Sequence, residues 1–378
     1  MFHHKKQNRR RGNVLVVACL LIFVIVSFTA LVVDLGYIHN AKVELQRSAD
    51  AAALAACWEL GDSSAQAGIT SQAMLASRQE AQNYATVNEI CKAATTLGQA
   101  DVEFGTVNNF SLTPVSFDTS DPSKFNAVRV RIRRDGDLNE DVPFFFGKVW
   151  GTDGKAMTAE ATAAMVRDIR GFKIPEDGSN LNILPFALDE YSWVQLLAGS
   201  GSDNWHWNPD NKSISSGSDG TLEVNLYPQG TGSPGNCGTV DIGGSNNSTN
   251  DIARQILTGI SASDMNAMGG TLEFDANGEL ILNGDTGISA GVKDELASIV
   301  GETRIIPIFS QVQGPGNNAD YTIVQWAGVR IMAVKLTGSK KSKYLMVQPA
   351  PCVTQGIIPG DGTGGTTEYV YSRAVLIR

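Results

Sequence analysis

The most prominent pattern in the chain is an apolar run near its start. Residues 14–33 contain no charge, proline or glycine, and all but five of them are Val, Leu, Ile or Phe. Twenty residues at 1.5 Å each cover the roughly 30 Å of a bilayer's hydrocarbon core. A buried helix of this length in a soluble domain normally carries a polar stripe, and this run has none. The pattern predicts a transmembrane helix.

A helical period continues beyond the apolar run. Apolar positions recur at steps of three and four at Leu35, Ile38, Ala41, Leu45, Ala49, Ala52 and Ala56. Residues 13–58 are therefore expected to form one rod about 70 Å long, which Gly61 and Asp62 end. A second helix is expected over about residues 64–94. If the two helices form an antiparallel hairpin, Cys57 and Cys91 lie about 30 Å apart, too far for a disulfide.

The period changes to two after Gly98. Residues 128–133 alternate Val or Ile with Arg, which predicts a strand with a solvated arginine face. Residues 142–151 are apolar and aromatic and predict a short helical turn, whereas residues 156–169 fit neither period clearly. The Gly-, Ser- and Asn-rich residues 172–250 predict short strands between turns. The rest of the chain predicts helices at 251–257 and 292–300 and strands at 304–309, 321–336, 343–348 and 369–377.

Charge orients the predicted span. Lys5, Lys6, Arg9, Arg10 and Arg11 precede it, and removing them from the net −9 leaves about −14 for the remainder. The positive-inside rule places the N-terminus in the cytoplasm. The acidic body argues against nucleic acid as a partner. The alternative, a cleaved signal peptide, needs a shorter run and a small-x-small site, which residues 34–37 do not supply.

The predicted topology places the five cysteines in two different environments. Cys19 lies in the span, and the other four, Cys57, Cys91, Cys237 and Cys352, are expected in an oxidising compartment where disulfides are permitted. The sequence alone leaves three pairings open. Cys237 and Cys352 are kept as the candidate disulfide.

Short motifs flank the apolar run on both sides. They are Arg10-Arg11-Gly12 before it, and Val33-Asp34-Leu35-Gly36, Leu45-Gln46 and the alanine-rich block at residues 49–56 after it. With the span, these motifs resemble the TadE/TadG-like family of the Flp-type (tight-adherence) pilus assembly system. Residues 142–151 followed by 159–170, and Gly235-Asn236-Cys237-Gly238 ahead of Asp241-Ile242, resemble the continuation in longer TadG-like proteins.

Two features of related proteins differ in this sequence. Many TadG-like proteins carry a von Willebrand A domain with a metal-binding Asp-x-Ser-x-Ser motif, which this sequence lacks. Pilin-like members are cleaved after a glycine that has a glutamate five residues on; here Gly12 is followed at that distance by Val17. The chain is therefore expected to be a retained anchor and not a processed pilin.

The helical stripe after the span is the candidate partner interface. It comprises Asp34, Ile38, Leu45, Ala49, Asp50, Ala52 and Ala56. Its small side chains allow another helix to approach closely. Two roles are open for Asp34. It lies in headgroup water and ends the span, or it pairs with a polar group of a partner helix.

Three patterns imitate other functions. Residues 287–291 spell G-x-S-x-G, but no histidine follows Ser289, as the hydrolase order requires. Trp205-His206-Trp207 offers aromatic faces to a sugar, although fixing a loop to the body is the simpler reading. Asp275, Asn277 and Glu279 lack the glycine and terminal carboxylate of a calcium loop. We therefore expect no enzyme, cofactor or metal site.

The sequence predicts an α+β protein: a transmembrane helix that continues into a helical stalk, followed by a β-rich extracytoplasmic body. The segments are a basic tail (1–11), the span (12–33), the stalk (34–98, TadG-like through about 58), a small mixed β region (99–171) and a β-rich domain (172–378). The resemblance implies a non-enzymatic assembly component of a Flp-type pilus or related apparatus, anchored once in the inner membrane and bound to other assembly proteins through its stalk. The alternative is a membrane-tethered adhesin that binds a surface glycan.

Overall fold

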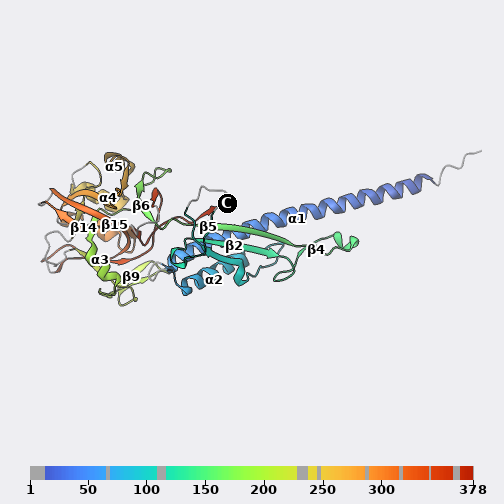
Figure 1. Ribbon diagram of the computed structural model, residues 1–378, viewed down its shortest axis with the longest axis horizontal. Coiled ribbons are helices and arrows are strands. Elements are labelled where there is room, and N and C mark those ends of the chain that lie inside the picture. The colour runs from blue at the N-terminus through green and yellow to red at the C-terminus, as the bar shows by residue number, and fades with distance from the viewer. Residues whose placement is uncertain are drawn as a thin grey trace, which may run out of the picture.

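The chain forms one long helix and two lobes; one lobe packs along the C-terminal part of the helix, and the other lies beyond the end of the helix (Figure 1). The computed structural model describes residues 13–64, 69–108, 116–227, 237–244, 248–285, 289–314, 318–339, 342–360 and 367–377. We call residues 34–164 with 375–377 the near lobe, and residues 169–372 the distal lobe. The predicted α+β class, with an N-terminal apolar helix before a β-rich body, is confirmed.

Helix α1 (Asn13–Ser64) has 52 residues and a length of about 78 Å. Its side chains are exposed almost throughout residues 14–33, and one face becomes buried from Asp34 onward. Among the described residues, α1 is the one helix long and apolar enough to cross a membrane. The helix also continues through Gly61, where the sequence predicted its end. A Cβ at Gly61 would lie 2.8 Å from the Met165 side chain, so glycine there serves packing and not helix termination.

Helix α2 (Ser71–Val87) runs antiparallel to α1. The Ser77 hydroxyl donates to the Ala56 carbonyl at 2.6 Å, and the Cys91 N–H donates to the Glu44 carboxylate at 2.7 Å. Ser77 early in α2 thus meets Ala56, and Cys91 just after α2 meets the earlier Glu44 of α1, which defines a hairpin. The helix is shorter than the predicted 64–94, because Thr70 caps its start and Cys91 has a left-handed φ of 55°. Cys57 and Cys91 are free thiols, as the hairpin requires.

The near lobe is completed by an antiparallel sheet on which α1 packs. Its order is β1 (Val102–Gly105), β2 (Ala127–Arg134), β5 (Met157–Ala164) and β21 (Val375–Ile377). The predicted strand at 128–133 is β2, and its arginines pair with Glu103, Glu160 and Asp101. The segments predicted as stalk and mixed β region share one hydrophobic core. The last strand of the predicted β-rich domain completes the near-lobe sheet.

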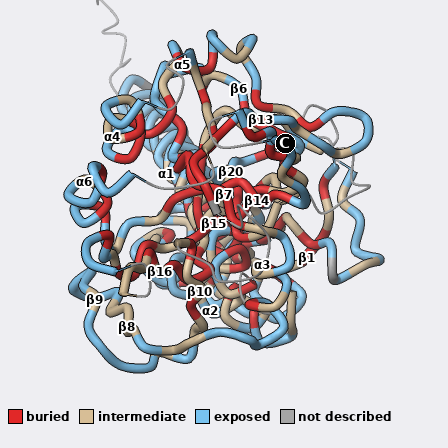
Figure 2. Tube along the Cα trace, turned by 90° about the vertical axis from the view of Figure 1, so that its left-hand side faces the viewer, coloured by how far each residue is buried: buried red, intermediate tan, exposed pale blue. Residues whose placement is uncertain are grey.

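The distal lobe is built on a barrel-like sheet. Strands β7 (Phe186–Asp189), β11 (Cys237–Val240), β13 (Leu280–Asp285), β15 (Ala319–Lys335) and β14 (Thr303–Gln313) pair in a closed ring. Strands β10 (Val224–Tyr227), β16 (Tyr344–Pro349) and β19 (Thr367–Glu368) extend it from β15. Much of β7, β14 and β15 is buried in the middle of the lobe (Figure 2).

Short helices and ribbons surround the distal ring. The helices are α3 (Glu190–Leu197), α4 (Thr249–Thr258), α5 (Ala262–Ala267) and α6 (Lys293–Ser298). The smaller sheets join β6 (Ile169–Lys173) with β12 (Thr271–Glu273) and β18 (Ile357–Pro359), β8 (Trp205–Asn208) with β9 (Ser213–Ser216), and β17 (Cys352–Thr354) with β20 (Val370–Ser372). The predicted helices at 251–257 and 292–300 and the predicted C-terminal strands at 304–309, 321–336 and 343–348 are confirmed.

Two antiparallel crossings of the chain connect the lobes. The Val166 N–H donates to the Ser372 hydroxyl at 2.7 Å, and the Ser372 N–H donates to the Val166 carbonyl at 3.0 Å. The outgoing and returning segments are therefore bonded to each other where they pass between the lobes. This arrangement brings the C-terminal strand back to the sheet that packs on α1.

Candidate functional site

The most highly connected polar group near the apolar run is the carboxylate of Asp34. It accepts hydrogen bonds from the backbone N–H groups of Phe145 (2.9 Å), Phe146 (3.2 Å) and Gly147 (2.8 Å). Only 6 % of Asp34 is exposed, so water competes little for these contacts. Convergent backbone N–H groups form a concave anion site, and bonds to a charged acceptor are stronger than neutral ones. Asp34 therefore fixes a distant turn of the chain to the start of the stalk.

The turn held by Asp34 connects β3 (Val142–Pro143) to β4 (Gly154–Lys155) and contains the short helix η3 (Gly147–Trp150). The turn is tight at Gly147, where a Cβ would lie 2.8 Å from the Phe144 side chain. Phe145 packs edge-on against Tyr37 of α1, with ring centroids 4.7 Å apart. We call Asp34, Tyr37 and residues 144–150 the juxtamembrane junction. The short helical turn predicted for residues 142–151 is thus present, and its partner is α1.

The predicted partner stripe is used within the chain itself. Leu45, Ala49, Ala52 and Ala56 are fully buried, in one core with α2 and the β2–β5 part of the sheet. Ile38 is half-buried. Small residues on α2, namely Ala73, Ser77, Ala81 and Ala85, are buried on its facing side. Small residues recur at steps of three and four in α1 and at four-residue steps in α2, a pattern that fits this internal pairing and a pairing with another protein's helix equally well.

Asp50 has a separate, local role. It is half-buried and accepts a hydrogen bond from the Gln46 amide at 2.8 Å, while the same amide donates to the Glu160 carbonyl of β5 at 3.2 Å. The contact of the stalk with another protein's helix stays a prediction. Its candidate surface is the face of α1 opposite the buried stripe, where Val43 is 55 % exposed.

Of the candidate disulfide between Cys237 and Cys352, the structure describes only the Cys352 side chain, so the bond stays a prediction. Cys352 is buried on β17, and its burial raises the pKa of the thiol to about 11. Cys237 belongs to β11 of the distal ring, and its side chain lies outside the described residues. The two backbone positions belong to different sheets, which sequence spacing could not indicate.

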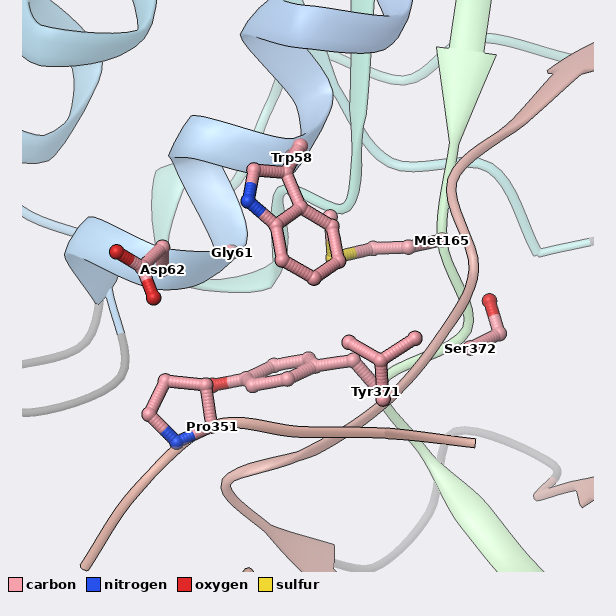
Figure 3. A pocket seen from close by; sticks show the side chains of 8 residues that line it. Trp58, Gly61, Asp62, Met165, Pro351, Tyr371 and Ser372 are labelled. Atoms are coloured by element: carbon pink, nitrogen blue, oxygen red, sulfur yellow. The ribbon is translucent and has the colours of Figure 1, made fainter. Parts of the chain in front are cut away.

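A small pocket lies where the lobes meet (Figure 3). Its cavity volume is only about 10 Å³, and it is lined by Trp58, Gly61 and Asp62 of α1 and by Met165, Pro351, Val353, Tyr371 and Ser372. Trp58 and Met165 lie on one side and Tyr371 and Pro351 on the other (Figure 3). Its walls are mostly apolar, and Asp62 is its one ionisable carboxylate. The pocket is a joint between the lobes and has no nucleophile–base pair.

The patterns that imitate catalysis and metal binding have local roles. Ser289 caps η4 (Ala290–Val292) by accepting the Gly291 N–H, and Gly287 and Ile288 lie outside the described residues. Asp275 accepts the backbone N–H groups of Asn277 and Glu279 and closes a turn. Within the described ranges, no group of three His, Cys, Asp or Glu side chains is arranged to hold a metal.

The aromatic ribbon of the distal lobe is attached to the ring. The Arg330 guanidinium lies 3.8 Å from the Trp207 ring centroid, and the Trp205 N–H donates to buried Glu223 at 2.8 Å. Arg330 therefore covers one face of Trp207, as expected for a loop fixed to the body. Glycan binding at residues 205–207 stays a prediction.

Comparison with known families agrees with the near-lobe architecture. The Flp pilus-assembly TadE/G-like model matches residues 12–67, and the Tad-like Flp pilus-assembly model matches residues 44–163. No curated protein and no solved structure matches the chain. The two matched ranges together cover α1, α2 and strands β1, β2 and β5, and both end before the distal lobe. Residues 12–163 of this chain are therefore similar to the TadE/G-like and Tad-like Flp pilus-assembly families.

Proposed function

We propose that this protein is a membrane-anchored, non-enzymatic assembly component of a Flp-type pilus. One observation supports the proposal: the family matches cover α1 and the lobe that packs on it. Helix α1 is exposed and apolar over residues 14–33 and then packs into the near lobe. An unbroken helix transmits force and orientation between a membrane and a folded domain. The fully buried alanine face makes that connection stiff, because little side chain separates the packed backbones.

The orientation that we propose places the N-terminus in the cytoplasm and both lobes outside the inner membrane. Five basic residues precede the span, whereas the remainder of the chain is acidic. Basic residues beside a span remain on the cytoplasmic side. Protease added to intact spheroplasts should remove the two lobes and leave a short N-terminal fragment. Full protection of the lobes, with digestion only after lysis, would reverse the proposed topology.

The surface that we propose for assembly partners is the exposed face of the stalk. Val43 lies on that face, 55 % exposed and nine residues from Asp34, on a helix whose other face is fully buried. It therefore presents apolar area beside the membrane without a contact inside the chain. Its neighbours at steps of three and four are His39, Asn40, Gln46 and Arg47, so a partner helix would meet a polar face with Val43 as its apolar centre.

Photo-crosslinking in cells that make the pilus tests this function. A benzophenone amino acid at position 43 should capture another protein of the same assembly machinery, identified by mass spectrometry. The matched control is position 281 in the distal lobe, because Ile281 is also 55 % exposed. If position 43 captures no assembly protein, or no more than position 281 does, the stalk is not the assembly surface. If cells lacking the protein assemble normal pili, the proposed role itself is wrong.

A further inference from the structure

The juxtamembrane junction exposes a group of large apolar side chains for which the fold supplies no cover. Phe145, Phe146 and Val149 are 63 %, 44 % and 81 % exposed, within five consecutive residues. The chain has ample interior to bury such residues, as the fully buried Trp193 and Trp326 show. A concentrated, exposed apolar group on a folded protein marks a surface that binds another apolar phase.

These side chains lie beside Asp34 of α1, and this position indicates what they bind. The backbone N–H groups of residues 145–147 lie within 3.2 Å of the Asp34 carboxylate, and Asp34 directly follows the exposed apolar segment. The β3–β4 ribbon is directed along α1 toward its N-terminal end (Figure 1). The headgroup layer adds about 5–7 Å on each side of the hydrocarbon core. Side chains fixed at the level of residue 34 thus lie inside that layer.

We propose that residues 144–150 form a second membrane contact, which inserts Phe145, Phe146 and Val149 into the interface of the same bilayer that α1 crosses. Aromatic side chains are favoured at this depth because their rings suit the boundary between hydrocarbon and water. The exposed Lys148 in the same turn suits the level of lipid phosphates. The inference rests on the proposed anchoring of α1 in a membrane.

This contact gives the protein a defined orientation at the membrane. A single helix leaves the lobes free to rotate about its axis and to tilt. A second contact on one side of α1, held there by Asp34 and by the packing of Phe145 on Tyr37, removes that freedom. The exposed stalk face around Val43 is then presented at a fixed angle to neighbouring proteins in the bilayer.

The test uses the full chain in phosphatidylcholine and phosphatidylglycerol vesicles with a benzophenone amino acid at one position at a time. Position 149 is the test site. Position 87 is the matched control, because Val87 is also 81 % exposed. It ends α2, and Cys91 just after it is hydrogen-bonded to Glu44 of α1, ten residues beyond Asp34. Position 28 is the positive control, since Phe28 is 65 % exposed within the apolar run. Mass spectrometry identifies each adduct as lipid or protein.

We expect lipid adducts at positions 28 and 149, and far fewer at position 87. A lipid adduct at position 28 with none at position 149 would overturn the second contact while leaving the anchor intact. Capture of a second protein copy at position 149 would assign the turn to a protein interface and also overturn the inference. Absence of lipid at position 28 would overturn the anchoring of α1, and with it the second contact.

Discussion

Asp34 provides the sharpest test of how the near lobe is held to the stalk. Its carboxylate accepts three backbone N–H groups, from Phe145, Phe146 and Gly147, with both oxygens engaged. The substitution Asp34→Asn keeps the shape of the side chain. It removes the charge and replaces one acceptor oxygen by an NH2 group. That NH2 group then faces a backbone N–H, and two donors cannot form a hydrogen bond.

The expected cost follows from the number and kind of bonds lost. A hydrogen bond to a charged group contributes about 1.5–3 kcal/mol, against about 0.5–1.5 kcal/mol for a neutral one. Losing one bond and weakening the others should cost about 2–3 kcal/mol in the docking of the turn. Since Asp34 is only 6 % exposed, water replaces little of this. At about 1.4 kcal/mol per factor of ten, opening of the turn should become about 30- to 150-fold more frequent.

Hydrogen exchange of the full chain in detergent micelles measures this opening directly. The peptide that contains residues 144–150 should exchange faster in Asp34→Asn by the factor given above, while peptides of the distal lobe remain unchanged. Asp50→Asn is the matched control, because Asp50 lies on the same helix and accepts its hydrogen bond from Gln46, one turn away on that helix. Unchanged exchange in Asp34→Asn, or an equal gain in Asp50→Asn, would refute the assignment of Asp34 as the anchor of the turn.

Three further predictions concern packing, the C-terminal strand and a buried thiol. Ala81→Leu should destabilise the near lobe by about 1–3 kcal/mol in chemical unfolding, because Ala81 is fully buried between the helices, whereas Thr86→Leu on the exposed side of α2 should have little effect. Ile377→Asp should cost about 3 kcal/mol because it places a carboxylate in the near-lobe core, and the adjacent Leu376→Asp, on the 38 % exposed side of β21, should cost far less. Burial raises the pKa of the Cys57 thiol to about 12, so raising the pH from about 7 to about 9 should leave iodoacetamide labelling of Cys57 low until the protein is unfolded. Labelling of Cys57 in the folded protein as fast as in the unfolded chain would contradict that burial.

The C-terminal strand illustrates what local pattern cannot supply. Residues 375–377 read as the end of a β-rich segment, and they do form a strand, β21. Its partner is β5 of the near lobe, more than two hundred residues earlier in the chain. Strand β5 was itself difficult to classify, because its alternation is between Ala and polar residues, which gives a weak contrast in hydrophobicity.

The helical stripe illustrates the same limit for the candidate site. Its period was readable, since steps of three and four place side chains on one face of a helix. The occupant of that face was not readable, because an α2 helix of the same chain and a helix of another protein make equal demands on small side chains. Gly61 is a related case: glycine usually favours a helix end, but here it admits Met165 and the helix continues.

The sequence by itself determined the features that need no distant partner. The apolar run, the helical period behind it, the alternation in β2 and the exclusion of a Cys57–Cys91 bridge by a hairpin all follow from composition and spacing over neighbouring residues. Only the tertiary structure decided that Asp34 receives the backbone of residues 145–147, that the alanine face is buried within the chain, and that the C-terminus returns to the near lobe. The physical reason is that burial and pairing energies depend on which surfaces meet, and contacts between separate segments of the chain leave no period in the local sequence.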